Sequence, residues 1–359
     1  MLRRKIYIQI MSKTSSFLKS AAVVSSFFGT TASVFPSDTV AENGVNASLS
    51  SFELSNIEHE QFAPNPAYKR EVEEWRKRYE ANLRKDGSWL TVAGLFWLQN
   101  GENWLGSLPT STVRLPEKAP ATLGSIRITG DAANPTIHFF PVTTVPVTVR
   151  RADGSSPNLL LDSSQKLAFD NDSGSSPDVI SVGELSLYVV RRTSKQGTRF
   201  AIRLKDSGSE ARKHFKGNAW FAVKPEYRIN ARFVEYETPK TVEIENILGG
   251  IEKHVTVGFA EFRIGKNTYT LDAEREGDKL FFNFRDRTSG KATYPAGRFL
   301  YADLPQNGVV TLDFNKAENP PCAFTSFATC PLPPRKNWLT VSIEAGEKTH
   351  HPFDETSKH

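Results

Sequence analysis

The sequence predicts a mainly β protein, built from two antiparallel β units with one amphipathic helix ahead of them. From Trp89 onward, short runs rich in Val, Ile, Phe and Thr are separated by Gly, Pro, Asn or Asp about every eight to twelve residues. The aromatic content is 11%, with 24 Phe, and aromatic side chains favour strands. No second long helical stripe interrupts these runs, which favours a forkhead-associated-like sandwich followed by a second sandwich or barrel-like domain over a doubly wound sheet.

The composition bounds the class of protein. The 359 residues suffice for roughly two domains, and 38% hydrophobic with 24% charged residues excludes general disorder and a multi-span membrane protein. The formal net charge of +5 lies entirely in residues 1–37, which hold five basic residues and no acidic one. The rest of the chain has 40 basic and 40 acidic residues, so its charge gives no reason to expect nucleic acid as a partner.

Residues 1–37 are predicted to be an export or targeting leader. The basic start, the apolar stretch at 21–35 and the small residues Thr30 and Ala32 are typical of a secretory signal. The Ser-rich, acid-free composition also fits an organellar transit peptide, and an uncleaved tail is a third interpretation. We therefore expect a secreted or periplasmic protein, with organelle targeting as the alternative. The stretch is too short for a transmembrane segment, which needs about 20 apolar residues.

A polar linker at 38–65 precedes an amphipathic helix at 66–86. Asn65 can cap this helix, Pro66 suits its first position, and Asp86 followed by glycine ends it. We interpret its aromatic face as docked on the β fold rather than as a ligand site. The apolar residues of that face recur every three or four positions, at Tyr68, Val72, Trp75, Tyr79 and Leu83.

The strand-like runs divide into an N-terminal β domain at 87–235 and a C-terminal β domain at 236–348, with a polar tail at 349–359. The boundary is placed where prolines separate one set of runs from the next. The alternation in TRFAIRLK (198–205) is that of a half-buried antiparallel strand.

Common catalytic motifs are absent: the chain has no Gly-x-Ser-x-Gly elbow, P-loop, Rossmann fingerprint or His-Glu-x-x-His. Its seven histidines are scattered, and neither a metal site nor a cofactor is predicted. The two cysteines, Cys322 and Cys330, predict a local disulfide if the chain is exported, and two buried thiols if it stays in a reducing compartment.

The strongest polar constellation lies at 285–348. In VVTLDFN (309–315), Thr311, Asp313 and Asn315 alternate with apolar residues and so share one face of a strand. The segment NPPCAFTSFATCPLPP (319–334) holds too many prolines for a helix or strand and predicts a rigid loop, hereafter the Pro/Cys loop. The ligand-binding candidates are Tyr294, Arg298, Asn315 and Asn319, and the catalytic candidates are Asp303, Asp313, Glu344 and Glu347.

Three functions are compatible with these residues, and the sequence leaves open whether the protein is an enzyme. The first is a binding module, in which Arg298 with the two asparagines holds a small polar or anionic ligand while Asp313 and Glu344 fix the arginine. The second is a hydrolase that uses two of the carboxylates as acid and base. The third is a structural envelope protein without a ligand. A purely structural role for the cluster is also open, with the arginine paired to a carboxylate to anchor the loop.

The segment GLFWLQNGENWLGSLPTSTVRLP (94–116) resembles the opening of forkhead-associated domains, with a strand, an Asn-Gly turn and a second strand ending at a glycine. That family binds phosphothreonine through an arginine directly after this glycine. Here Ser107 follows Gly106, and no Ser-Arg-x-x-His stretch follows at 119–130. The resemblance therefore implies a fold rather than phosphopeptide binding.

A longer resemblance runs from about Tyr68 to Lys348. Its most specific strings are WLTVAGLFWLQNGEN, FRDRTSGKATYPAGRFLYADLP, LDFNKAENPPCAFTSFATCPLPP and the closing IEAGEK. Through them the sequence is similar to the bacterial family catalogued as domain of unknown function 1684. The resemblance implies no activity, cofactor or catalytic residue, because none is established for that family.

Overall fold

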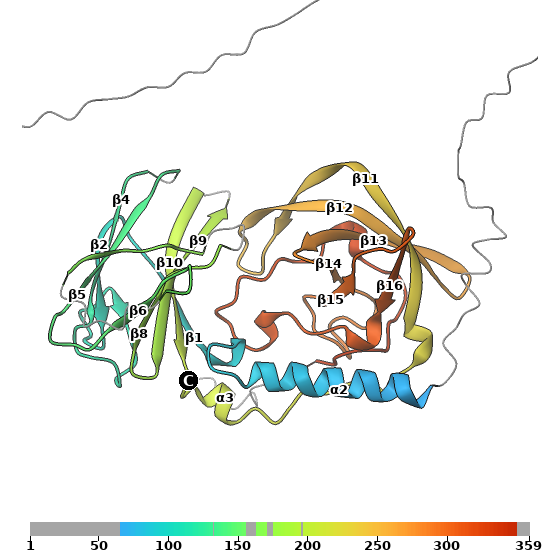
Figure 1. The fold of residues 1–359 in the computed structure, drawn as a ribbon, viewed down its shortest axis with the longest axis horizontal. Coiled ribbons are helices and arrows are strands. Elements are labelled where there is room, and N and C mark those ends of the chain that lie inside the picture. The colour runs from blue at the N-terminus through green and yellow to red at the C-terminus, as the bar shows by residue number, and fades with distance from the viewer. Residues whose placement is uncertain (1–64, 132, 156–162, 171–174, 195–196, 350–359) are drawn as a thin grey trace, which may run out of the picture. The chain divides into compact units, whose positions relative to one another are not determined.

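The computed structural model describes residues 65–131, 133–155, 163–170, 175–194 and 197–349 (Figure 1). Within these residues the fold is mainly β, and the strand ladders are antiparallel except for the short β2–β3 pair. The predicted fold class is thus confirmed, including its single long helix near the N-terminus. No helix in the described part of the chain is long and apolar enough to cross a membrane. The predicted leader lies outside the described residues.

Helix α2 (Pro66–Leu83) forms where the apolar spacing predicts it. The Asn65 side chain accepts a hydrogen bond from the Ala67 amide at 2.9 Å, which caps the first turn. The helix ends at Leu83, three residues before the predicted end, and the chain then turns through Gly87 at φ +75°. Figure 1 shows α2, in blue, alongside the C-terminal sheet.

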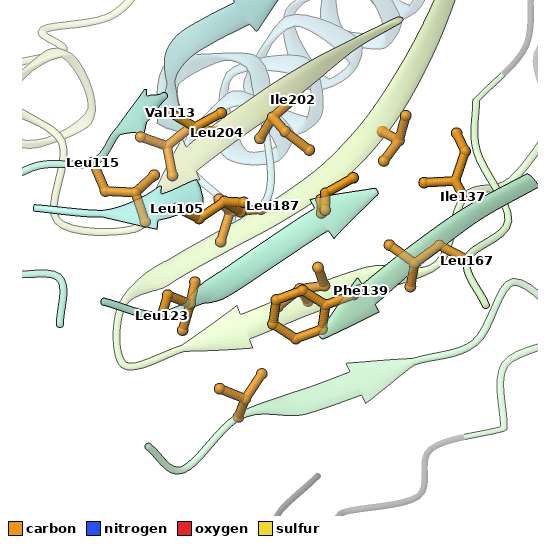
Figure 2. Close-up of a cluster of buried hydrophobic side chains, with 14 of the residues drawn as sticks. Leu105, Val113, Leu115, Leu123, Ile137, Phe139, Leu167, Leu187, Ile202 and Leu204 are labelled. Carbon is orange, nitrogen blue, oxygen red and sulfur yellow. The ribbon is translucent and has the colours of Figure 1, made fainter. Parts of the chain in front are cut away.

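The N-terminal β region consists of two sheets packed face to face, and Figure 2 shows the side chains between them. One sheet has the order β1 (Val92–Trp97), β10 (Gly197–Asp206), β9 (Leu185–Ser194), β8 (Val179–Val182) and β6 (Thr148–Arg150). The other has the order β3 (Val113–Arg114), β2 (Gly101–Gly106), β4 (Gly124–Thr129), β5 (Thr136–Pro141) and β7 (Gln165–Lys166). Fully buried Leu105, Phe139 and Ile202 lie in the core that both sheets share.

The segment 94–116 does not form the hairpin expected from its Asn-Gly turn. Strand β1 pairs with β10, whereas β2 pairs with β4, so the two strands belong to different sheets. The side chain of Asn103 explains the crossover, because it accepts from the Gln99 amide at 2.9 Å and donates to the Gln99 carbonyl at 2.9 Å. These bonds fix the turn that carries the chain from one sheet to the other.

The C-terminal β region is one strongly curved sheet. Its order is β15 (Arg298–Asp303), β14 (Lys279–Phe284), β13 (Asn267–Glu276), β12 (Ile251–Ile264), β11 (Arg228–Glu245) and β16 (Val309–Asp313). The two edge strands, β15 and β16, approach each other without a hydrogen-bonded ladder. Fully buried aromatic residues fill the inside, among them Phe282, Phe284 and Phe314. The sheet is thus a nearly closed barrel with its opening between β15 and β16.

Short helical turns connect the strands: η1 (Trp89–Thr91), α3 (Glu210–Lys213), η2 (Pro225–Tyr227), η3 (Phe314–Lys316), η4 (Pro321–Ala323) and η5 (Arg335–Asn337).

The turn η3 corrects the prediction made for Asn315. Strand β16 ends at Asp313, and Asn315 lies in η3 rather than on the strand face expected for it. The physical reason is that the Asp313 side chain accepts from the Asn315 amide at 3.2 Å and so starts the turn.

The Pro/Cys loop packs into the protein instead of standing over a pocket. Ala323 and Phe324 lie in a buried cluster with Leu83 and Leu90. Further along the loop, Cys330 packs with aromatic residues of the barrel. The predicted disulfide is not formed: Cys322 and Cys330 are free cysteines, and the Cys322 amide donates to the Cys330 sulfur at 3.1 Å.

The chain enters and leaves the N-terminal β region at one place. The Leu90 carbonyl accepts from the Ser209 hydroxyl at 2.6 Å, and Arg212 pairs with Asp86 at 2.7 Å. Strand β11 runs through the predicted boundary between residues 235 and 236, and the barrel core begins with Ala231. The division into domains stays a prediction.

Candidate functional site

Arg298, the central residue of the predicted ligand site, is enclosed. It is 1% exposed and forms an ion pair with Asp286 at 3.1 Å. Its other donors reach the carbonyls of Ile343, at 3.0 Å, and Ala345. The sequence assigned Asp313 and Glu344 to hold this arginine, but the structure uses Asp286. Arg298 therefore pairs with a carboxylate, as the structural interpretation has it, but anchors the segment after η5 rather than the Pro/Cys loop.

Asp313 and Asn315 meet Tyr68 of α2. The Tyr68 hydroxyl donates to Asp313 at 2.7 Å and accepts from the Asn315 amide group at 2.9 Å. The side-chain oxygen of Asn315 accepts from the Lys224 amide at 2.9 Å. This network fastens the helix to the end of β16.

Asn319 and Glu347 form a second buried pair. The Asn319 amide donates to Glu347 at 2.8 Å, and its side chain donates to the Lys348 carbonyl at 2.8 Å. Burial raises the pKa of the Glu347 carboxyl to about 8. Its second carboxyl oxygen, Oε1, is buried and has no hydrogen-bond partner within the described residues.

The remaining candidates lie apart from these groups. Asp303 and Glu344 are exposed and pair with Lys279 and Lys224. The Tyr294 hydroxyl donates to the Cys322 carbonyl at 2.8 Å, and burial raises the pKa of Tyr294. The structure therefore distributes the predicted site residues over several packing contacts. Asp303 and Asp313 both line one pocket.

That pocket lies at the barrel opening and has a volume of about 690 Å³. Helix α2 forms one wall, and strands β15 and β16 with their connection form the other. Its charged side chains pair with one another: Lys316 contacts Glu71 at 2.6 Å, and Arg228 contacts the same carboxylate at 3.4 Å. Hereafter this is the charged pocket.

A smaller pocket of about 290 Å³ adjoins it and shares Trp75, Tyr301 and Lys316 with it. We call it the aromatic pocket. Helix α2 provides four of its lining residues, β15 one, and the segment around η3 the other two. These residues are Trp75, Arg78, Tyr79, Asn82, Tyr301, Lys316 and Glu318.

Glu318 is the unusual group of the aromatic pocket. Its backbone pairs with Phe299 through two hydrogen bonds of 2.9 Å, which place its side chain beside β15. Within the described part of the chain, no side chain or amide donates a hydrogen bond to its carboxyl group or forms an ion pair with it. Burial alone raises the pKa of Glu318 to about 8.

The aromatic rings of this pocket are held in place by their neighbours. Trp75 and Tyr79 are one helical turn apart, with nearly parallel rings whose centroids are 5.5 Å apart. Trp220 packs edge-on against both at 5.9 Å. Its indole N–H donates to Glu80 at 3.1 Å, and the guanidinium of Arg76 lies 4.7 Å from its ring centroid. The wall is thus preorganised.

Burial and neighbouring carboxylates raise the pKa of both tyrosines of the aromatic pocket. The pKa of Tyr301 is raised by burial and by the carboxylates of Glu276 and Glu318. The pKa of Tyr79 is raised by burial and by Glu347 and Glu318. Both phenols therefore stay neutral at neutral pH.

Sequence reasoning missed Glu318 and interpreted Trp75 and Tyr79 as packing residues only. Glu318 stands inside the specific string LDFNKAENPPC, but nothing in that string shows that its carboxyl is enclosed without a partner. The one feature of the sequence that could have indicated Glu318 is an acidic residue directly before the proline-rich loop. No metal site emerges either, because the described residues include no group of three or more His, Cys, Asp or Glu that could hold an ion.

Comparisons with known proteins match the C-terminal half. A family model described as "Protein of unknown function (DUF1684)" matches residues 213–348. The chain is also similar to the solution NMR structure of an uncharacterized protein from Haloarcula marismortui, with 35% identity over 38% of this chain and 79% of that chain and a TM-score of 0.33. No curated protein matches the chain. The family match begins beyond residues 94–116 and gives the forkhead-associated resemblance no support.

Proposed function

We propose that this chain, which belongs to the DUF1684 family of proteins of unknown function, binds a small polar ligand in the aromatic pocket. The observation that carries the proposal is Glu318, a carboxyl group without a partner in the described residues that faces a cavity walled by Trp75, Tyr79 and Tyr301. Binding sites commonly combine an apolar, preformed wall with a few polar groups that orient the ligand. The proposal moves the site from the Pro/Cys loop to the contact between α2 and β15.

A thermal-shift panel of cationic, neutral and anionic metabolites tests this proposal, because a ligand that binds only the folded state raises Tm. We expect a shift that disappears in Glu318→Gln. The matched control is Glu344→Gln, which removes a carboxylate that is exposed and outside the aromatic pocket. A ligand-induced shift that persists undiminished in Glu318→Gln and in Trp75→Leu would exclude this pocket.

A hydrolase is the second candidate. A carboxyl group with a pKa of about 8 is largely protonated at neutral pH and can act as a general acid. The neighbouring charged pocket offers Asp303 and Asp313 as carboxylates. Screening of chromogenic glycosides and esters tests this function. An authentic activity should fall about 100-fold or more in Glu318→Gln, and an activity that does not fall belongs to another protein in the preparation.

We also propose that the protein is exported, on the basis of residues 1–37. N-terminal sequencing of protein purified from the native host tests this. Cleavage before Asp38 supports export, and an intact Met1 in the purified protein contradicts it.

A further inference from the structure

We infer that the ligand of the aromatic pocket carries an ammonium group, received by the rings of Trp75, Tyr79 and Tyr301 and by the carboxylate of Glu318. The inference rests on the proposed function and names the chemical class of its ligand. Primary amines and quaternary ammonium compounds belong to this class.

The first argument is the aromatic wall. Ring faces carry negative charge density and attract cations within about 6 Å of the ring centroid, with Trp the best partner. Trp75 and Tyr79 come from the helix and Tyr301 from the strand, so rings from two elements line one cavity. Trp75 and Tyr79 are half-buried and Tyr301 is 40% exposed, which leaves ring surface free for a ligand.

The second argument is the charge balance of the lining residues. Lys316 is already held by Glu71, at 2.6 Å, and by Asp313, at 3.5 Å. Arg78 lies exposed on α2, where water screens its charge. Glu318 has no ion-pair partner in the described part of the chain. An enclosed carboxylate is costly unless a cation pairs with it, and a ligand ammonium supplies that cation.

The charges of the residues that line the aromatic pocket also disfavour an anionic ligand. Such a ligand would face Glu318 and would need Lys316 to leave its two carboxylates. It would also approach the carboxylates that, after burial, contribute to the raised pKa of Tyr79 and Tyr301. Like-charge contact of this kind selects against the wrong ligand.

Cation binding should release a proton from Glu318. Burial raises the pKa of this carboxyl to about 8, and the ammonium pairs only with the ionised form, so affinity should rise about tenfold per pH unit up to pH 8 and then level off. Arg78 and Lys316 are the cationic groups that line the same pocket, and Tyr79 and Tyr301 stay neutral. Glu347 titrates in the same range but does not line the pocket, so it serves as the control.

The experiment is isothermal titration of the full chain with choline and with its neutral isostere 3,3-dimethylbutan-1-ol, between about pH 6 and pH 9. We expect choline to bind with the pH dependence above and the isostere to bind at least about tenfold more weakly. Glu318→Gln should weaken choline about tenfold or more and remove the pH dependence. Glu347→Gln removes an equally buried carboxyl with the same pKa, and should retain choline binding.

Trp75→Leu keeps the apolar volume but removes the ring, and should weaken choline binding, while Trp338→Leu at an exposed indole outside the pocket should not. Equal affinity for choline and the isostere, or unchanged choline binding in Glu318→Gln, overturns the inference. If neither binds but a neutral or anionic panel member does so in a Glu318-dependent way, this inference fails while the proposed function stands. If nothing binds, both fail.

Discussion

At the level of single residues, Glu318 and Glu347 are two carboxyl groups kept largely neutral at physiological pH. Burial raises the pKa of each to about 8, and the charge of Glu318 contributes further to the raised pKa of Glu347. Glu318 faces a pocket, whereas Glu347 is 0% exposed and holds the Asn319 amide. The same chemical group therefore lines a pocket in one place and serves packing in the other.

Glu347→Gln should make stability less sensitive to pH. The folded pKa of about 8 lies above the unfolded value of about 4.5, so the native state holds an extra proton in this window and wild-type stability falls as pH rises through it. The Glu347→Gln variant does not lose stability in this way, because a glutamine side chain does not titrate. We expect equal stability near pH 5, and near pH 8 a variant more stable by up to a few kcal/mol, since one unit of pKa corresponds to about 1.4 kcal/mol.

Urea unfolding at several pH values measures this difference. Glu344→Gln, at an exposed carboxylate, is the control and should show a difference from wild type of less than about 0.5 kcal/mol at each pH. A Glu347→Gln difference that does not change with pH would contradict the assignment of the raised pKa.

The sequence could not predict which polar side chains are buried together. The sequence left open that Arg298 pairs with a carboxylate to anchor the Pro/Cys loop, whereas in the structure its donors reach the carbonyls of Ile343 and Ala345, beyond that loop. Which carboxylate pairs with Arg298 depends on how β14 and the segment after η5 meet, and Asp286 was not among the candidates. Pairings between distant segments follow from tertiary packing, which composition and spacing do not encode locally.

At the level of elements, helix α2 is joined to the barrel through polar groups as well as its apolar stripe. Arg76 is 9% exposed and donates to the carbonyls of Phe221 at 2.9 Å and Asn315 at 3.1 Å. The 3.6-residue periodicity predicted the helix and its apolar face, since both depend on neighbours four positions apart. It could not predict that a buried arginine and a tyrosine hydroxyl hold the helix at the barrel opening.

Tyr68→Phe should loosen α2 from the barrel. The change keeps the ring but removes the hydroxyl that donates to Asp313 and accepts from Asn315. Leaving these buried groups without that partner should cost about 1 to 3 kcal/mol. Urea unfolding measures the loss, and hydrogen exchange should show faster exchange in α2. Tyr188→Phe is the control, because no hydrogen bond of the Tyr188 hydroxyl occurs within the described residues; equal losses in both variants would contradict the assigned role.

At the level of the whole molecule, we interpret the N-terminal β region, which lies between α2 and the barrel along the chain, as an insertion. The family match at 213–348 covers the barrel but not α2, although α2 forms one wall of both pockets. The buried cores of the two β regions share no residue. Insertions are tolerated where the two ends of the inserted segment lie close together. The two ends of the N-terminal β region do so, because the Ser209 hydroxyl donates to the Leu90 carbonyl.

A chain in which residues 65–92 are joined to 205–349 by Asn-Gly should therefore fold. Val92 and Lys205 are antiparallel partners, so a two-residue turn can connect them. The shortened chain keeps Leu90 with Phe324 and Trp89 with Cys330. We expect one cooperative urea transition followed by tryptophan fluorescence. The matched control, which begins at Ser88 and so lacks α2, should lose that transition because the barrel opening is uncovered. If the shortened chain shows no cooperative transition, the insertion is wrongly placed. If the control unfolds as cooperatively and at the same urea concentration, α2 contributes nothing to the barrel.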